Sequence, residues 1–246
     1  MKSLTKLTFV IIMICGIIFS SVFDENDAYS QSIQGGLNLL IGVPQGDFKE
    51  NIGTSKVGGS IWAGYKLKNS PVSFGLELDY FMYGKTKRTE LFNNNIPEVN
   101  VDVSTTYNIL SALSFLRFSS KRGNVIPYFD CLVGFNYLYT RTSVSDDEDY
   151  FESIAATTNY DDTSLSYGFG LGCMLKIFDI QNKKNENNPF QVFLNFRFQY
   201  LLGNEADYLR KGSLTTAGQR VIYDLSRSRT DMLTIQIGAN VIFDIR

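Results

Sequence analysis

The segment that decides the fold is FQVFLNFRFQYLL, residues 190–202, because its side chains alternate along its whole length. One set of alternate positions is entirely apolar and comprises Phe190, Val192, Leu194, Phe196, Phe198 and Tyr200. The other set carries Gln191, Asn195, Arg197 and Gln199, together with Phe193. Since successive side chains of a strand point to opposite faces, the pattern predicts a β-strand with one apolar face and one polar face.

The same alternation recurs along the chain and predicts eight strands in all. The other segments are 32–43, 57–67, 72–83, 104–119, 125–140, 163–178 and 232–243. The alternation of 104–119 is blurred, so its faces cannot be assigned from the sequence. A globular strand usually has about 5–6 residues, whereas a strand that crosses a bilayer at a tilt needs about 9–11. The observed lengths therefore favour strands that cross a membrane.

The connections between these strands alternate in length. Segments 68–71 and 120–124 are short and 179–189 is moderate, and all three are rich in turn-forming residues. The other connections are longer, at 44–56, 84–103, 141–162 and 203–231. This pattern is typical of a barrel with short periplasmic turns and long extracellular loops. The predicted fold is all-β: an eight-stranded antiparallel up-and-down transmembrane β-barrel.

The polar faces of the strands carry charges of both signs, which the barrel would enclose. The expected lumen network consists of Lys66, Glu77, Asp79, Asp130, Lys176 and Arg197. Eight strands leave an interior just wide enough for side chains to fill, and buried charges persist only when they are paired. We therefore expect a polar network that fills the lumen, with a proton or ion path as the alternative. A catalytic carboxylate pair at Glu77 and Asp79 is disfavoured because a filled lumen gives a substrate no access.

The first 30 residues are predicted to be a signal peptide. Lys2 and Lys6 form a basic start, residues 7–23 are apolar, and Ala28 and Ser30 are small residues at the positions that precede a cleavage site. We expect cleavage after Ser30, leaving residues 31–246 as one barrel domain. The alternative is a retained N-terminal membrane helix, for which 7–23 is at the short limit.

The composition excludes several classes of function. The net charge is −2, which does not suggest a nucleic-acid partner. The chain has no histidine, which is the commonest general base and metal ligand in proteins. We therefore expect no enzymatic activity, no cofactor and no metal site. Cys131 and Cys173 both lie on apolar strand faces, where they are either a disulfide pair or small apolar fillers.

The stretch from Tyr107 to Thr140 resembles strands four and five of the small outer membrane β-barrel family of Gram-negative bacteria, which includes porin-family and OmpA- or OmpX-like barrels. The matching features are Tyr107, a basic turn at Lys121 and Arg122, the Pro127–Tyr128 opening, and Gly134 followed by aromatic residues. The start GGLNLLIGVPQGDF is also similar to the first strand and loop of that family. The resemblance implies an outer-membrane location and folding by the outer-membrane assembly machinery.

Two of the long connections have a marked charge. Segment 141–162 is acidic, which is compatible with Ca²⁺ binding but fits a solvated surface better. Segment 203–231 is basic, so it either contacts lipopolysaccharide phosphates or is simply solvated, and residues 220–226 are candidates for a hairpin beyond the membrane.

These features favour a structural, surface-interaction or secretion-accessory barrel of the cell envelope. Its expected partners are membrane lipids and lipopolysaccharide. One alternative is a narrow porin or transporter for small solutes. Another is a soluble secreted β-barrel that binds an apolar ligand.

Overall fold

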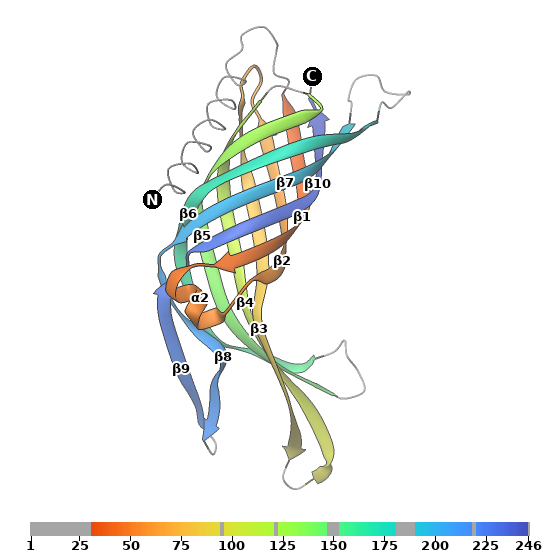
Figure 1. Ribbon diagram of the computed structural model, residues 1–246. Coiled ribbons are helices and arrows are strands. Elements are labelled where there is room, and N and C mark those ends of the chain that lie inside the picture. The colour runs from red at the N-terminus through yellow and green to blue at the C-terminus, as the bar shows by residue number, and fades with distance from the viewer. Residues whose placement is uncertain are drawn as a thin grey trace.

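The computed structural model describes residues 31–93, 96–120, 123–146, 153–180, 190–217 and 220–245. The eight barrel strands are β1 (Ser32–Pro44), β2 (Lys56–Lys66), β3 (Val72–Asn93), β4 (Ile96–Ser119), β5 (Val125–Asp146), β6 (Ser153–Ile180), β7 (Phe190–Gly203) and β10 (Met232–Asp244). Each strand pairs antiparallel with its neighbours in the order β1–β10–β7–β6–β5–β4–β3–β2, and the pairing of β1 with β2 closes the barrel (Figure 1). The predicted strand number and topology are therefore confirmed.

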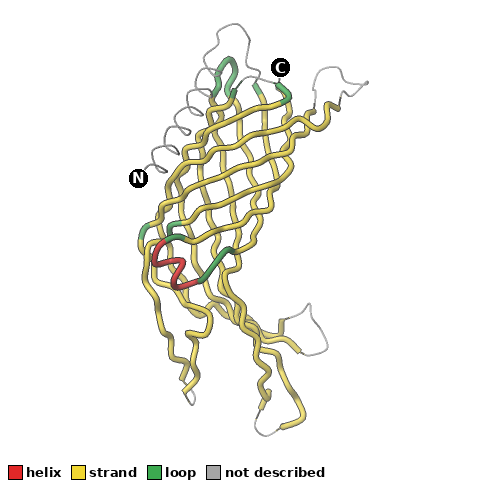
Figure 2. The backbone as a smooth tube through the Cα atoms, viewed as in Figure 1, coloured by secondary structure: helices red, strands yellow, loops and turns green. Residues whose placement is uncertain are grey.

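The two ends of the barrel differ. At one end, Ser32 pairs with Asp244 and short turns join β2 to β3 and β4 to β5; we call this the turn end. At the other end, the helix α2 (Gly46–Ile52) joins β1 to β2, and a separate hairpin of β8 (Glu205–Ala217) and β9 (Arg220–Arg229) lies between β7 and β10 (Figure 2). We call this the hairpin end.

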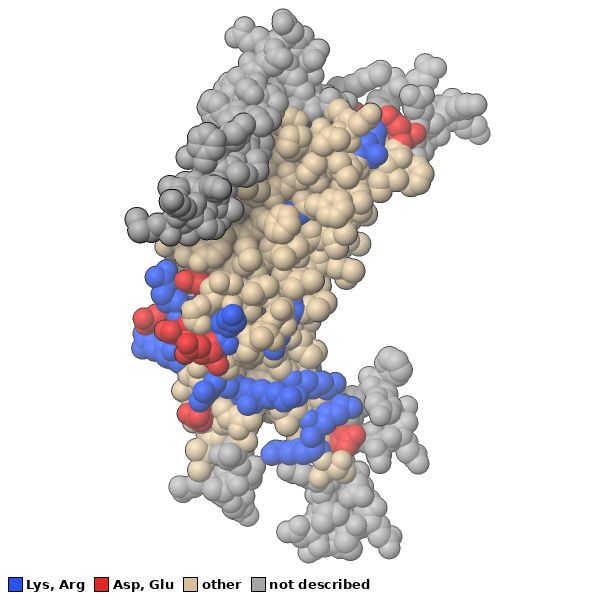
Figure 3. All heavy atoms as spheres, in the orientation of Figure 1, with Lys and Arg blue, Asp and Glu red and all other residues tan. Residues whose placement is uncertain are grey.

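The outer wall of the barrel is apolar, because the apolar set of each strand points outward. Side chains that are more than half accessible include Leu37, Leu39, Val57, Ile61, Leu76, Val133, Phe135 and Phe198. Figure 3 shows a largely uncharged wall between charged zones near the two ends. A closed barrel also pairs every backbone group between its strands, which a hydrocarbon environment requires.

The expectation of long loops at 84–103 and 141–162 is wrong over most of their length. β3 and β4 continue to pair through Glu90 and Val101, and β5 and β6 continue through Val144 and Ala155. These segments lack an apolar face but are rich in Thr, Ser and Val, residues compatible with strand geometry. The strands therefore extend past the apolar wall as a continuation of the barrel sheet (Figure 1).

Several other expectations can be placed. Cys131 and Cys173 are both free, so the disulfide alternative is wrong. A hairpin does form in segment 203–231, at β8 and β9. Among the described residues, no helix has the length and apolar character needed to cross a membrane. The signal peptide at 1–30 and most of the acidic residues of 141–162 lie outside the described residues.

Candidate functional site

The lumen is lined by the polar set of each strand, and five charged side chains meet near its middle. Glu77 and Asp79 come from β3, Arg117 from β4, Asp130 from β5 and Arg197 from β7. Each of these residues is at most 1% exposed. Strands far apart in the sequence therefore place their charges in one water-excluded space.

Ion pairs join four of these residues in a chain. Arg197 contacts Glu77 through Nη1 and Oε2 at 2.6 Å, and Asp130 through Nη2 and Oδ2 at 2.6 Å. Arg117 binds Asp130 with two parallel hydrogen bonds, from Nε to Oδ1 at 2.8 Å and from Nη2 to Oδ2 at 3.0 Å. Fork-to-fork guanidinium–carboxylate pairs are among the strongest polar contacts in proteins. The order Glu77–Arg197–Asp130–Arg117, which we call the ion chain, compensates each charge with an opposite one.

Amide and hydroxyl groups complete the surroundings of Glu77. Its Oε1 accepts hydrogen bonds from Gln236 Nε2 at 2.9 Å, Gln199 Nε2 at 3.2 Å and Ser60 Oγ at 3.3 Å. Thr234 Oγ1 in turn donates to Gln199 Oε1 at 2.8 Å, which orients that amide. These donors come from β2, β7 and β10, so their hydrogen bonds to Glu77 join these three strands to β3. A buried carboxylate needs several donors in this way to offset its lost hydration.

Aromatic rings cover the guanidinium of Arg117. The Cζ of Arg117 lies 3.9 Å from the ring centroid of Tyr128 and 4.5 Å from that of Trp62. The polar atoms of both rings are also bonded, with Trp62 Nε1 donating to Asn240 at 3.2 Å and Tyr128 Oη donating to Asn195 at 2.6 Å. Cation–π contacts of this kind strengthen when they are desolvated. Arg117 is therefore held between its carboxylate partner and two anchored rings.

Apolar layers close the lumen on both sides of the ion chain. The layer at the turn end consists of Ile126, Tyr128, Met174, Phe193 and Ile242. The layer at the hairpin end is larger and includes residues from α2 and β8. Its members are Leu40, Phe48, Ile52, Phe81, Tyr83, Tyr107, Ile109, Leu138, Ala206, Tyr208, Leu209 and Met232. The lumen is therefore a packed core with a polar centre.

The hairpin end is fixed by contacts between α2 and β8. Phe48 packs edge-on against Tyr208 with ring centroids 5.3 Å apart. Tyr208 Oη also accepts a hydrogen bond from Asn51 Nδ2 at 2.9 Å and shares one with Ser228 Oγ at 2.7 Å. Burial raises the pKa of the Tyr208 hydroxyl above its usual value, so the hydroxyl stays neutral. The cap over the lumen is thus a bonded structure.

The sheet is closed, its outer wall is apolar, and its interior holds charged side chains in ion pairs. This combination is typical of a barrel that spans a membrane. The chain has the fold of a small outer-membrane β-barrel. This assignment rests on its own strand pairing, register and side-chain distribution.

Comparisons with known proteins give low similarities to such barrels. No protein-family model and no curated protein sequence matches the chain. Neisserial surface protein A is 13% identical, with 89% of this chain and 100% of that chain covered and a TM-score of 0.39. Ail, the attachment invasion locus protein of Yersinia pestis, solved with the heparin analogue sucrose octasulfate, is 14% identical over 88% of this chain and 99% of that chain, with a TM-score of 0.32. A major outer membrane protein from Thermus thermophilus is 11% identical over 85% of this chain and 98% of that chain, with a TM-score of 0.28.

Not every residue expected in the network belongs to the ion chain. Lys66 points inward at the turn end, where Nζ donates to Ser119 Oγ at 3.0 Å. Lys176 lies outside the ion chain: its side chain is 23% exposed, and its Nζ lies 3.4 Å from Asp179 Oδ2. The register of β6 against β7 shifts between Lys176 and Phe178, and this irregularity lies next to the turn end. Lys176 is therefore at the rim of the barrel.

Asp79 is buried in the lumen but lies outside the ion chain. It is 0% exposed, and neither of its carboxylate oxygens has a hydrogen-bond partner among the described residues. Its neighbours across the strands are Ser60 and Ser111. The centre of the lumen therefore holds three carboxylates and two guanidiniums, and Asp79 is the carboxylate without a guanidinium.

Arg117 is the functional residue that sequence reasoning missed, because β4 carries apolar residues on its inner face as well. Leu113 and Phe115 point inward and belong to a lumen cluster, which blurs the alternation. The register that places Arg117 opposite Asp130 also pairs Ser119 with Tyr128, and it is centred beyond the middle of the predicted turn at 120–124, so the turn does not reveal this pair.

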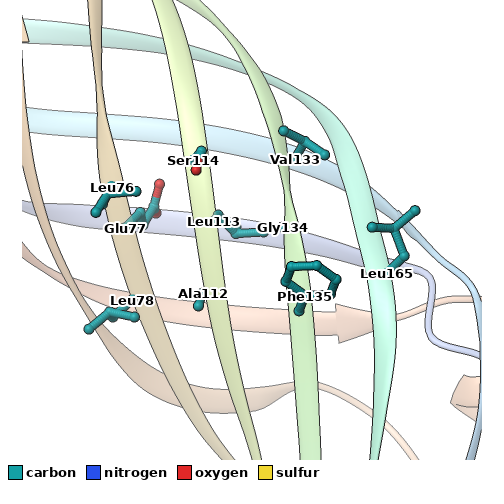
Figure 4. Close-up of a pocket in the computed structure, with 10 residues that line it drawn as sticks. All are labelled: Leu76, Glu77, Leu78, Ala112, Leu113, Ser114, Val133, Gly134, Phe135 and Leu165. Carbon is teal, nitrogen blue, oxygen red and sulfur yellow. The ribbon is translucent and has the colours of Figure 1, made fainter.

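A hollow of about 450 Å³ lies on the outer wall rather than in the lumen. Leu76 and Leu78 border it on one side and Phe135 and Leu165 on the other, with Ala112 and Ser114 between them (Figure 4). Its lining is largely apolar; its polar residues are Ser114 and Glu77, and the carboxylate of Glu77 belongs to the ion chain. Among the described residues, no group of three or more acidic, cysteine or histidine side chains is placed to hold a metal ion.

Proposed function

We propose that the protein is an integral outer-membrane barrel with a closed lumen and a structural or surface-interaction role. The observation that carries this proposal is the ion chain, sealed between apolar layers at both ends. Solute passage would have to break buried ion pairs and leave their charges uncompensated, which is costly. A narrow porin or transporter is therefore disfavoured.

The outer wall supports the location. Soluble proteins rarely expose contiguous apolar patches of more than a few hundred Å², whereas this barrel exposes large apolar side chains on β1, β2, β3, β5, β6 and β7. The wall suits lipid tails, and the charged zones near its ends suit the headgroup regions. We propose membrane lipids and lipopolysaccharide as its surroundings, and the outer-membrane assembly machinery as the partner that inserts it after signal cleavage.

The proposed role does not include catalysis. Glu77 is bonded to Arg197 and two amides, and Asp130 to two arginines, so neither carboxylate is available to a substrate. The proposed work of the protein lies instead in the parts that extend beyond the apolar wall. These are the extended ends of β3 to β6 and the β8–β9 hairpin.

Cell fractionation tests the location. The full chain, expressed with its N-terminal 30 residues in a Gram-negative host, is expected in the outer-membrane fraction, where only detergent releases it. An unrelated soluble periplasmic protein followed in the same cells serves as the control. Recovery of the folded barrel in the aqueous periplasmic fraction would contradict the membrane location and would favour the soluble alternative.

Planar-bilayer recording tests the closed lumen. The refolded barrel is expected to insert without stable, stepwise conductance, because the ion chain and the two apolar layers fill the lumen. A known open porin recorded in the same bilayer controls for insertion. Reproducible ohmic steps that change amplitude in an Arg197→Ser variant would show instead that Arg197 lines a conducting path.

A further inference from the structure

Asp79 is a buried acid that the ion chain does not use. Its side chain is 0% exposed, and neither carboxyl oxygen accepts a hydrogen bond from the described residues. Ser60 of β2 and Ser111 of β4 lie opposite it across the sheet, but Ser60 Oγ donates to Glu77 Oε1 at 3.3 Å. Burying an ionised carboxylate without hydrogen-bond donors is far more costly than burying the neutral acid, because nothing replaces the lost hydration.

Glu77 lies two residues earlier on the same inner face of β3, and its surroundings are the opposite. Its Oε2 accepts a hydrogen bond from Arg197 at 2.6 Å, and its Oε1 accepts one from Gln236 at 2.9 Å. Donors to both oxygens favour the ionised form of this carboxylate. The Asp79 carboxyl group is close enough to Glu77 for a hydrogen bond between the two acids. Two carboxyl groups that share one site do not both ionise readily, so a proton on one of them relieves their repulsion.

The charges at the centre of the lumen balance only when one acid is neutral. Arg117 and Arg197 carry two positive charges, whereas Glu77, Asp79 and Asp130 would carry three negative charges if all were ionised. The polar side chains that the other strands place around them are neutral: Asn38, Ser60, Ser164, Thr234 and Gln236. The titratable groups farther along the described lumen are Lys66 and Tyr128 toward the turn end, and Tyr83, Tyr107 and Tyr208 at the hairpin end.

The space around Asp79 decides what can neutralise it. Both oxygens are fully enclosed by protein atoms, so a metal ion or a water molecule has no room beside them. A proton needs no additional space. We propose that Asp79 is a proton-binding site, which holds one proton at neutral pH and donates it in a hydrogen bond to the carboxylate of Glu77. The two acids then carry one negative charge between them, and the five ionisable groups at the centre of the lumen are neutral as a whole.

This proton makes the stability of the barrel depend on pH. In the unfolded chain Asp79 is in water and is ionised above about pH 5, whereas the folded barrel keeps the proton. Folding therefore takes up one proton from water, and stability falls as the pH rises. The contribution of this group to the equilibrium constant of unfolding is a tenfold increase per pH unit, between about pH 5.5 and 7.5.

Infrared spectroscopy of the intact barrel in lipid vesicles tests the proposal directly. A protonated carboxylic acid has a C=O stretching band that a carboxylate lacks. We expect this band at neutral pH, and we expect it to shift when the aspartates carry ¹³C in their side-chain carboxyl groups but not when the glutamates do. Absence of the band in the folded barrel, or a shift with labelled glutamate only, would overturn the proposal. The labelling result uses the wild-type chain, so it does not depend on the folding of a variant.

A pair of variants assigns the proton to Asp79. Asp79→Asn is expected to lose the band, and urea titrations at several pH values are expected to show the tenfold change per pH unit in the ratio of the wild-type to the variant unfolding constant. Asp224→Asn is the matched control, because this aspartate of β9 is 70% exposed; it is expected to keep the band and the wild-type pH dependence. Heat-dependent gel mobility confirms that both variants fold. A band that persists in folded Asp79→Asn, or a ratio that stays constant with pH, would contradict the proton site.

Discussion

Replacing Arg197 with methionine is expected to lower the free energy of unfolding of the barrel by about 3–5 kcal/mol, the usual cost of removing one partner from a buried ion pair. Methionine preserves much of the volume but leaves Glu77 without a cation in a site that is 1% exposed. Urea titration in lipid vesicles provides the measurement. The only tryptophan of the chain, Trp62, lies in the lumen beside Arg117 and reports its exposure through fluorescence.

Two variants serve as controls for this experiment. Lys176→Met breaks the ion pair between Lys176 and Asp179, whose side chains are 23% and 42% exposed, respectively. The free energy of unfolding is therefore expected to change by about 0–1 kcal/mol. Asp79→Asn replaces a buried carboxyl group that has no hydrogen-bond partner among the described residues, and the free energy of unfolding is expected to stay unchanged or to rise. If Arg197→Met stayed within about 1 kcal/mol of the wild-type protein, the ion chain would not stabilise the barrel as buried ion pairs do.

The architecture was predictable because it depends on alternation, which the sequence displays directly. The sequence alone defines the two faces of β7. Phe196 and Phe198 lie on one face, and Arg197 lies on the other face with Asn195 and Gln199. Lipid demands an unbroken apolar outer face, so the pattern is clean where the inner face is polar, as on β7. The inward direction of Glu77, Asp79 and Asp130 follows from the same rule, and the structure places all three in the lumen.

The partners of these charges were not predictable from alternation, because they depend on register across the whole barrel. Arg197 reaches Glu77 on β3, across the lumen from β7, and Asp130 on β5, and neither of these strands is adjacent to β7. The extended sheet was missed for a different reason. Beyond the apolar wall, both faces of the strands carry polar residues such as Thr86 and Thr105. The sequence there shows no alternation of apolar and polar residues.

A second large effect is expected at Gly134, where β5 approaches β4 too closely for any side chain. A Cβ atom added there would lie 2.0 Å from the carbonyl oxygen of Ala112 and 2.8 Å from the Cα of Leu113. Both atoms belong to the backbone, so no rotamer change relieves the contact, and the two strands must separate. Glycine within a strand often marks such a close backbone approach. Gly134→Ala is therefore expected to destabilise the barrel by about 1–3 kcal/mol or more.

Gly59→Ala is the matched control, because its added Cβ would lie 3.9 Å from the nearest atom, the carbonyl oxygen of Asn38. The same methyl group is added to a strand in both variants, so propensity and chain entropy change alike and only the contact differs. Urea midpoints and the fraction of heat-modifiable, folded barrel give the comparison. Equal midpoints for the two variants would mean that β4 and β5 can move apart freely at Leu113. That outcome would also weaken the case for a rigid lumen, since Arg117 and Asp130 hold the same pair of strands together four residues farther along.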